Sequence, residues 1–218
     1  MHRYENRHRR LAIGLAILAG FVDALGFLKL NGMFVSFMSG NSTRMAVGVA
    51  TPLHGSLFAG ALIAAFVAGV MAGTAAGAAA QRWRKQVVLA LVMATLALAS
   101  LSEMIASDSI APTLLMASAM GMANAVFQRN GEVSVGVTYM TGTLVKLGQH
   151  LMLAVMGGPP FAWLPYLLLW LGLVVGAMAG AVAFMTLGLQ ALWFAVTFAG
   201  VLLIAAVSLG PLPAKVPS

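Results

Sequence analysis

Two short stretches of the sequence, residues 34–43 (FVSFMSGNST) and residues 138–143 (TYMTGT), share the pattern aromatic-Met-Ser/Thr-Gly inside long apolar runs. Glycine permits backbone conformations that interrupt a helix. Hydroxyl and amide side chains can bond the backbone groups that such an interruption leaves free. The two stretches therefore predict either unwound helices or the tips of re-entrant hairpins. The alternative is that they are ordinary close-packing residues of complete membrane spans.

The composition around these stretches is that of a polytopic membrane protein. Of the 218 residues, 61% are hydrophobic and only 8% are charged, whereas soluble domains carry about 25% charged residues. So few polar side chains exclude a water-soluble globule, and the high hydrophobicity excludes a disordered chain. The net charge of +7 does not indicate nucleic-acid binding, because the cations are few and flank apolar runs. Cysteine is absent, which excludes disulfides and thiolate metal sites.

Eight apolar segments follow a basic tail at residues 1–10, and each is close to the roughly 20 residues that cross a bilayer as a helix. They are residues 11–28, 32–51, 57–80, 86–102, 111–128, 134–156, 161–185 and 189–210. The breaks between them are short and polar or contain turn residues. This pattern predicts an all-α integral membrane protein without a soluble domain.

The second half of the chain repeats features of the first half in the same order. Residues 20–24 (GFVDA) recur as residues 121–125 (GMANA), and the motif at 34–43 recurs at 138–143. Glycines at four-residue spacing recur as well, first as Gly69, Gly73 and Gly77 and then as Gly172, Gly176 and Gly180. The distance along the chain between a feature and its copy is 101 residues for the first pair, 102 for the motifs and 103 for the glycines. We therefore expect a duplication with repeats at 11–108 and 109–210, followed by a tail at 211–218.

The basic residues predict that the two repeats are inverted relative to each other. If all eight segments cross the membrane, the two sides carry five Lys and Arg residues each. If segments 32–51 and 134–156 do not cross, nine lie on the side of the N-terminus and only Lys29 lies on the other. Because Lys and Arg are enriched on the cytoplasmic side, the second arrangement is favoured, with a cytoplasmic N-terminus. Three crossings in each repeat then invert the second repeat, as in many secondary transporters.

Polar residues within the apolar segments form the candidate site. Asp23 lies deep in the first segment, where an acid costs about 2.5–3.5 kcal/mol and needs a partner or water, and Arg44 is the expected partner. In the second repeat Asn124 replaces the acid while Lys146 keeps the cation, which leaves one surplus positive charge. A surplus cation beside the amides of a broken helix favours an anion. The expected binding residues are Asp23, Ser39, Gly40, Asn41, Arg44, Asn124, Thr141, Gly142, Thr143 and Lys146.

Two alternatives remain open for these residues. Asp23 and Arg44 can form a structural ion pair that joins two segments, and Lys146 can pair with Asp23 as well, which leaves no spare charge. His150 lies one helical turn after Lys146 and is on the same helix face. The glycine stripes indicate close helix packing, either within the protein or at a homodimer interface.

Enzyme signatures are missing from the sequence. It contains no HExxH, GxSxG or Walker motif, and no apolar segment carries a pair of carboxylates. We therefore expect neither an enzyme nor a bound metal or cofactor.

Residues 20–24, 34–43 and 138–142 together resemble the YoaK-like family of bacterial membrane proteins, also called domain of unknown function 1275. The resemblance covers essentially the whole chain. It implies a single-domain protein of the bacterial inner membrane but supplies neither substrate nor mechanism. The second motif has Thr143 where the first has Asn41, so a site built from both need not be symmetric.

The sequence thus predicts two inverted three-crossing repeats, each with a broken or re-entrant second segment. The expected function is secondary transport of a small solute, an anion or a zwitterion being favoured. The alternatives are a non-transporting structural or regulatory partner and a small channel. Membrane lipid and the solute are the expected partners, nucleic acid is not, and a homodimer would use the glycine-stripe helices.

Overall fold

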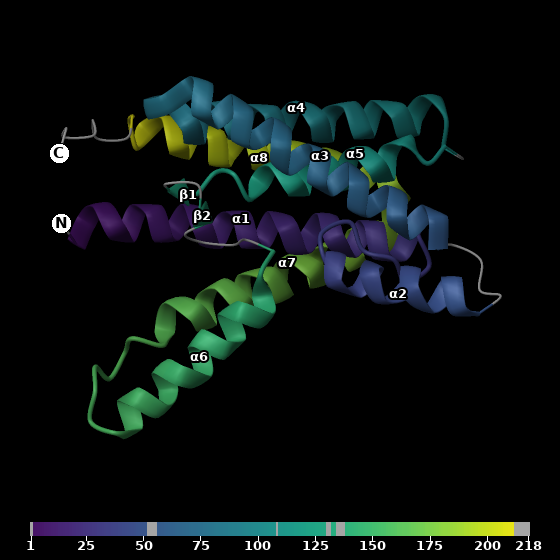
Figure 1. Ribbon diagram of the computed structural model, residues 1–218. Helices are drawn as coiled ribbons and strands as arrows, with labels where there is room; N and C mark the ends of the chain where they lie inside the picture. Colours follow the sequence, from purple (N-terminus) through teal and green to yellow (C-terminus); the bar gives the residue numbers. More distant parts are fainter. Residues whose placement is uncertain (1, 52–55, 108, 130–131, 134–137, 212–218) are drawn as a thin grey trace.

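The computed structural model describes residues 2–51, 56–107, 109–129, 132–133 and 138–211, and they form a bundle of helices (Figure 1). The helices are α1 (His2–Lys29), α2 (Met38–Ala50), α3 (Ser56–Ala80), α4 (Arg84–Ile105), α5 (Ala111–Ala123), α6 (Met140–Val155), α7 (Leu164–Leu187) and α8 (Leu192–Ser208). Two 3₁₀ turns, η1 (Gln81–Trp83) and η2 (Gly188–Ala191), join neighbouring helices. The only strands in the described residues, β1 (Gln128–Arg129) and β2 (Glu132–Val133), pair as a small antiparallel hairpin. The expected helical class is therefore confirmed.

Three continuous helical stretches are long and apolar enough to cross a membrane, namely His8–Lys29, Ser56–Ile105 and Leu164–Ser208. The second and third stretches contain 50 and 45 residues. At 1.5 Å per residue a straight helix of that size would be about 70 Å long, more than twice the hydrocarbon thickness. Each instead folds back at a 3₁₀ turn, where Gln81 (φ 45°) and Gly188 (φ 59°) adopt left-handed backbone conformations.

The outer surface of the bundle is apolar, as a lipid-facing surface requires. Large hydrophobic side chains are exposed along the three helices that carry the most apolar sequence. Examples are Val67 and Met71 on α3, Val175, Met178 and Val182 on α7, and Val201 and Ile204 on α8. The interior is also apolar, with Leu15, Leu89, Leu96 and Leu192 fully buried. A helix that is hydrophobic on all sides is typical of a membrane span.

The glycine stripes bring helices from the two halves of the chain into contact. A Cβ atom on Gly176 of α7 would overlap the carbonyl oxygen of Ile17 in α1, and one on Gly69 of α3 would overlap that of Ser118 in α5. These glycine faces are thus occupied within one chain. A homodimer formed through α3 and α7 would have to use their other faces.

The two short helices α2 and α6 begin near the middle of the molecule and run toward opposite ends (Figure 1). They contain 13 and 16 residues, or about 20 and 24 Å of helix, which is less than a membrane crossing. Each begins at the methionine of its motif, Met38 or Met140. The motif therefore marks a helix start rather than the centre of a span.

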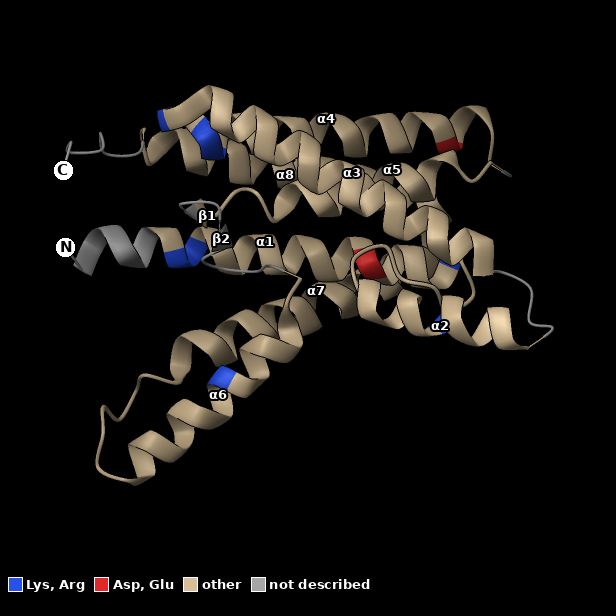
Figure 2. Cartoon of the chain, in the orientation of Figure 1, with Lys and Arg blue, Asp and Glu red and all other residues tan. Residues whose placement is uncertain are grey.

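Basic residues concentrate at the end of the bundle that holds the N-terminus, and other charged residues are spread over the rest of the fold (Figure 2). The end that holds the N-terminus also holds the α3–α4 turn, and there Lys85 Nζ lies 2.9 Å from His8 Nδ1. Arg84 at the same turn donates to Gln128 Oε1 at 2.9 Å. At the opposite end, Lys29 is paired with Glu103. Most of the described cations thus lie at a single end.

Candidate functional site

The loop that precedes α2 is fastened from both sides. Asp23 Oδ1 in α1 accepts hydrogen bonds from the backbone N–H groups of Val35 (2.9 Å) and Ser36 (2.8 Å). From α2, Asn41 accepts a bond from the N–H of Phe34 (3.0 Å) and donates one to its carbonyl oxygen (2.6 Å). A loop inside an apolar protein must satisfy its backbone groups internally, and these two side chains do so.

The expected ion pair between Asp23 and Arg44 is wrong, because the carboxylate bonds the loop amides instead. Arg44 is exposed on α2, and its guanidinium lies against Gly32, where a Cβ atom would be 2.9 Å from Nη2. Lys146 is exposed on α6, and the ring of His150 stacks on Tyr166 with centroids 5.0 Å apart. The surplus cation is therefore not placed beside the acid.

The described residues next to the start of α6 are held in a related way. Asn124 accepts a hydrogen bond from the hydroxyl of Thr138 (3.2 Å) and donates to the carbonyl oxygen of Met120 (3.0 Å). Thr143, which takes the place of Asn41, donates only to the carbonyl oxygen of Tyr139 within its own helix turn (3.2 Å). Asn124 thus holds Thr138 much as Asp23 holds Ser36.

A cavity of about 280 Å³ lies where the two motifs meet. Both motifs and one residue of α3 line it. The lining residues are Ser36, Phe37, Met38, Ser39, Phe66, Thr138, Tyr139, Met140, Thr141 and Gly142. The cavity thus joins two segments that are about one hundred residues apart in the sequence.

Three of the expected binding residues, Ser39, Thr141 and Gly142, line this cavity. Asp23 and Asn124 lie behind it and hold the loops. The other expected residues are not among the lining residues: Gly40, Asn41, Arg44, Thr143 and Lys146. The structure therefore brings the motif tips together but leaves both cations outside.

The lining combines five hydroxyl groups, three aromatic rings and two thioethers, and none of these described residues is charged. The helices α2 and α6 both start at the cavity without a side-chain cap. Their first N–H groups have no partner within the helix, and the helix N-terminus favours electron-rich atoms. Largely apolar walls with a few polar groups are typical of sites for small molecules.

The sequence reasoning missed several lining residues. Ser36 and Thr138 lie within the quoted motifs at the same offset of 102 residues as Met38 and Met140, so the repeat itself could have identified them. The aromatic and methionine positions of the motifs were noted only as a pattern. Phe66 carried no signal, because it is one apolar residue among many in α3.

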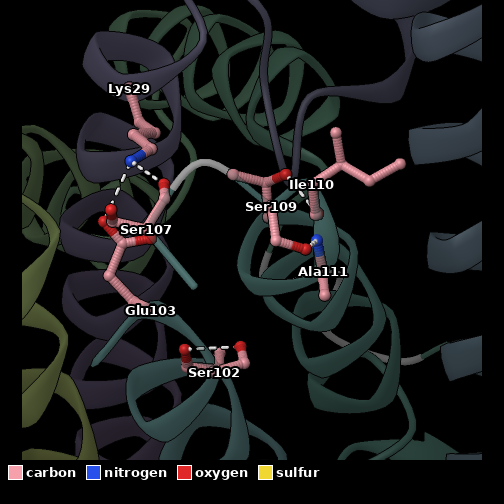
Figure 3. A network of polar contacts seen from close by, with 9 residues as sticks. Lys29, Ser102, Glu103, Ser107, Ser109, Ile110 and Ala111 are labelled. Atoms are coloured by element: carbon pink, nitrogen blue, oxygen red, sulfur yellow. Dashed lines mark hydrogen bonds and ion pairs between the residues drawn. The ribbon is translucent and has the colours of Figure 1, made fainter. Parts of the chain in front are cut away.

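A second polar network lies at the end of α1 and α4, away from the cavity (Figure 3). Lys29 Nζ donates to Glu103 Oε1 and to the carbonyl oxygen of Ser107, both at 2.9 Å. Glu103 is 9% exposed, and its Oε2 has no hydrogen-bond partner among the described residues. No group of three His, Asp or Glu residues in the described part of the chain could hold a metal ion.

Comparisons with known proteins agree with the membrane architecture. The family model described as "Protein of unknown function (DUF1275)" matches residues 11–205. A protein of Rhizobium meliloti (strain 1021), described as "UPF0700 transmembrane protein RA0705", is 38% identical over 196 residues, which cover 86% of this chain and 83% of the relative. No solved structure matches the chain.

Proposed function

The chain belongs to the DUF1275 family, and we propose that it is a secondary transporter of a small solute in a bacterial inner membrane. The observation that carries this proposal is the cavity lined by both motifs. Secondary transporters with inverted repeats bind their solute near the bilayer midplane, between discontinuous helices of the two repeats. A cavity between the starts of two short helices is consistent with that arrangement.

Equivalent contacts in the two halves support an inverted duplication. Gly176 of the second half packs on Ile17 of the first, and Gly69 of the first half packs on Ser118 of the second, and these residue pairs occupy corresponding positions. Two further pairs of contacts correspond in the same way: Gly180 on Phe21 and Gly73 on Met122, and Gly20 on Leu173 and Gly121 on Phe66. The helices α1 and α5 run in opposite directions (Figure 1), as inversion requires.

These contacts revise one part of the sequence alignment. They relate α3 to α7 by an offset of 107 residues, since Gly69 corresponds to Gly176, whereas the glycine stripes alone suggested 103. A stripe with one glycine every four residues matches itself after a shift of one helical turn. The offset of 107 also brings the last residue of α3, Ala80, onto the last residue of α7, Leu187.

The arrangement suggests how access could alternate between the two sides. The helices α2 and α6 lead from the cavity toward opposite ends of the molecule. Displacing one motif relative to the other would open the cavity to one side while the second motif keeps the other side closed. The cations at the N-terminal end favour a cytoplasmic N-terminus.

A non-transporting structural partner is the second candidate, and one observation favours it. Asp23 and Asn124 bond other groups of the chain rather than lining the cavity. Buried polar residues used in this way fix helix positions without any solute.

Single cysteines distinguish the two candidates, because the chain has no cysteine of its own. Ser39→Cys and Thr141→Cys place thiols in the cavity, and Thr197→Cys on an exposed face of α8 serves as the matched control. A membrane-impermeant maleimide is applied to either face of oriented vesicles. For a transporter we expect labelling of both cavity positions from both faces and of the control from neither. Labelling from one face or from none would contradict the proposal, and ion conductance in planar bilayers would indicate a channel.

A further inference from the structure

We infer that the solute is a small, uncharged, flat aromatic molecule with hydrogen-bonding groups on its edge. This inference rests on the proposed function, since it takes the cavity between the motifs as the solute site. It names the substrate class from the size, charge and chemistry of the lining.

The size of the cavity favours a small solute. Sites for drug-sized ligands have volumes of about 300–1,000 Å³, and this cavity, at about 280 Å³, lies just below that range. A molecule with about one ring therefore suits it.

The charge of the solute follows from what the lining lacks. An ion that enters a site without a counter-charge loses part of its hydration without compensation. None of the described lining residues is charged, and Arg44 and Lys146 are not among them. Asp23, which is not a lining residue, already accepts two loop amides with Oδ1. An uncharged solute avoids this cost, and its acceptor atoms still benefit from the N-terminal ends of α2 and α6.

The walls favour an aromatic ring over an aliphatic group of equal size. Phe37, Phe66 and Tyr139 contribute rings, and Met38 and Met140 contribute thioethers. Aromatic pairs are worth about 0.5–1.5 kcal/mol beyond the area they bury, and thioether sulfur makes further favourable contacts with rings. Three of the lining residues contribute rings to the wall of this small cavity. The cavity therefore favours flat aromatic solutes.

The hydroxyl groups provide the polar contacts. Ser39 and Thr141 occupy equivalent positions in the two motifs, and neither hydroxyl has a hydrogen bond to another described residue. Thr138 donates its proton to Asn124, so its oxygen remains an acceptor. Hydroxyl groups can both donate and accept, which suits a solute that has a carbonyl oxygen and an N–H group on its edge.

Three related compounds of nearly equal size test the proposal on the purified protein. Benzamide has the ring and no charge, benzoate adds the charge, and cyclohexanecarboxamide removes the aromaticity. By isothermal calorimetry we expect benzamide to bind, benzoate to bind at least tenfold more weakly and cyclohexanecarboxamide at least threefold more weakly. Equal binding of all three, tighter binding of benzoate, or no binding of benzamide, nicotinamide and uracil at millimolar concentration would overturn the inference.

Two variants connect the binding to the cavity. Phe66→Leu should remove most of the preference for benzamide over cyclohexanecarboxamide, whereas Phe161→Leu, in an exposed residue outside the lining, should keep it. The comparison is made between variants whose melting temperatures have been shown to be equal. A preference that survives Phe66→Leu would place the ring elsewhere and overturn the inference.

The cysteine experiment separates this inference from the proposed function. Access to the cavity from both membrane faces without benzamide binding would retain the transporter and reject the solute class. Benzamide binding with access from one face only would retain the solute class and reject transport.

Discussion

The segments before α2 and α6 both contain a copy of the motif, but among the described residues they are fastened by different numbers of hydrogen bonds. In the first, Asp23 and Asn41 together make four hydrogen bonds to loop backbone groups. In the second, the described residues provide one bond between Asn124 and Thr138. The helix α6 also leans away from the bundle beside α7 (Figure 1). Among the described residues the first motif is fastened by more bonds than the second, and we predict that the first acts as an anchor and that the second is the motif that moves.

The difference follows from two substitutions between the halves. A carboxylate has only acceptor sites, so Asp23 can take two N–H groups with one oxygen. Asn124 has an NH₂ group that must also be satisfied, and it bonds the carbonyl oxygen of Met120 in its own helix. Replacement of Asn41 by Thr143 removes the reach across to the preceding loop, because a threonine hydroxyl bonds its own helix turn.

The largest difference between the halves is expected for Asp23→Leu compared with Asn124→Leu. Asp23→Leu leaves the buried N–H groups of Val35 and Ser36 without a partner, at about 1–3 kcal/mol each, or about 4 kcal/mol in total. Asn124→Leu releases one hydroxyl and should cost about 1 kcal/mol. Chemical unfolding of the purified protein in mixed micelles measures both. Equal costs would remove the distinction between an anchored and a mobile motif.

The second test concerns the ion pair where the anchored loop begins. Lys29→Met leaves Glu103, which is 9% exposed, without its counter-charge, and we expect a loss of about 3 kcal/mol. Glu103→Gln keeps an oxygen that can accept from Lys29 and should cost less. The same unfolding measurement applies, with Lys146→Met on exposed α6 as the control, for which we expect a change below about 0.5 kcal/mol. If Lys146→Met lowered the unfolding free energy as much as Lys29→Met, then α6 would also be held in place by an electrostatic interaction.

Much of this architecture could be predicted from the sequence because membranes impose simple rules. Long apolar runs gave the helical class, and the two motifs marked where α2 and α6 begin. The sequence also predicted that the two motifs belong to one site, and residues of both motifs line the same cavity. Its detailed chemistry could not be predicted by the same reasoning.

The incorrect expectation concerned the partner of Asp23. The sequence favours Arg44 as this partner and leaves Lys146 as an alternative, because an ion pair is the simplest way to compensate a buried acid. The loop before α2 contains its own unsatisfied N–H groups, however, and these donors depend on a backbone path that residue types do not reveal. The glycine stripes suggested an offset of 103 residues, whereas the contacts indicate 107. A stripe with one glycine every four residues matches itself after a shift of four residues, so the sequence alone does not distinguish these two offsets.

The smallest expected effect on stability, and the most direct test of the mobile motif, is Thr143→Asn. This change introduces at the second motif the residue type that fastens the first, where Asn41 bonds Phe34, and we expect it to fasten the second motif in the same way. We expect a gain of at most about 1 kcal/mol in unfolding free energy. Because the second loop would then be held as firmly as the first, labelling of Thr141→Cys should fall severalfold on the face toward which α6 runs and stay unchanged on the other. Thr143→Ser, which keeps the hydroxyl, is the control, and labelling that Thr143→Asn leaves unaltered on both faces would show that the second loop does not control access.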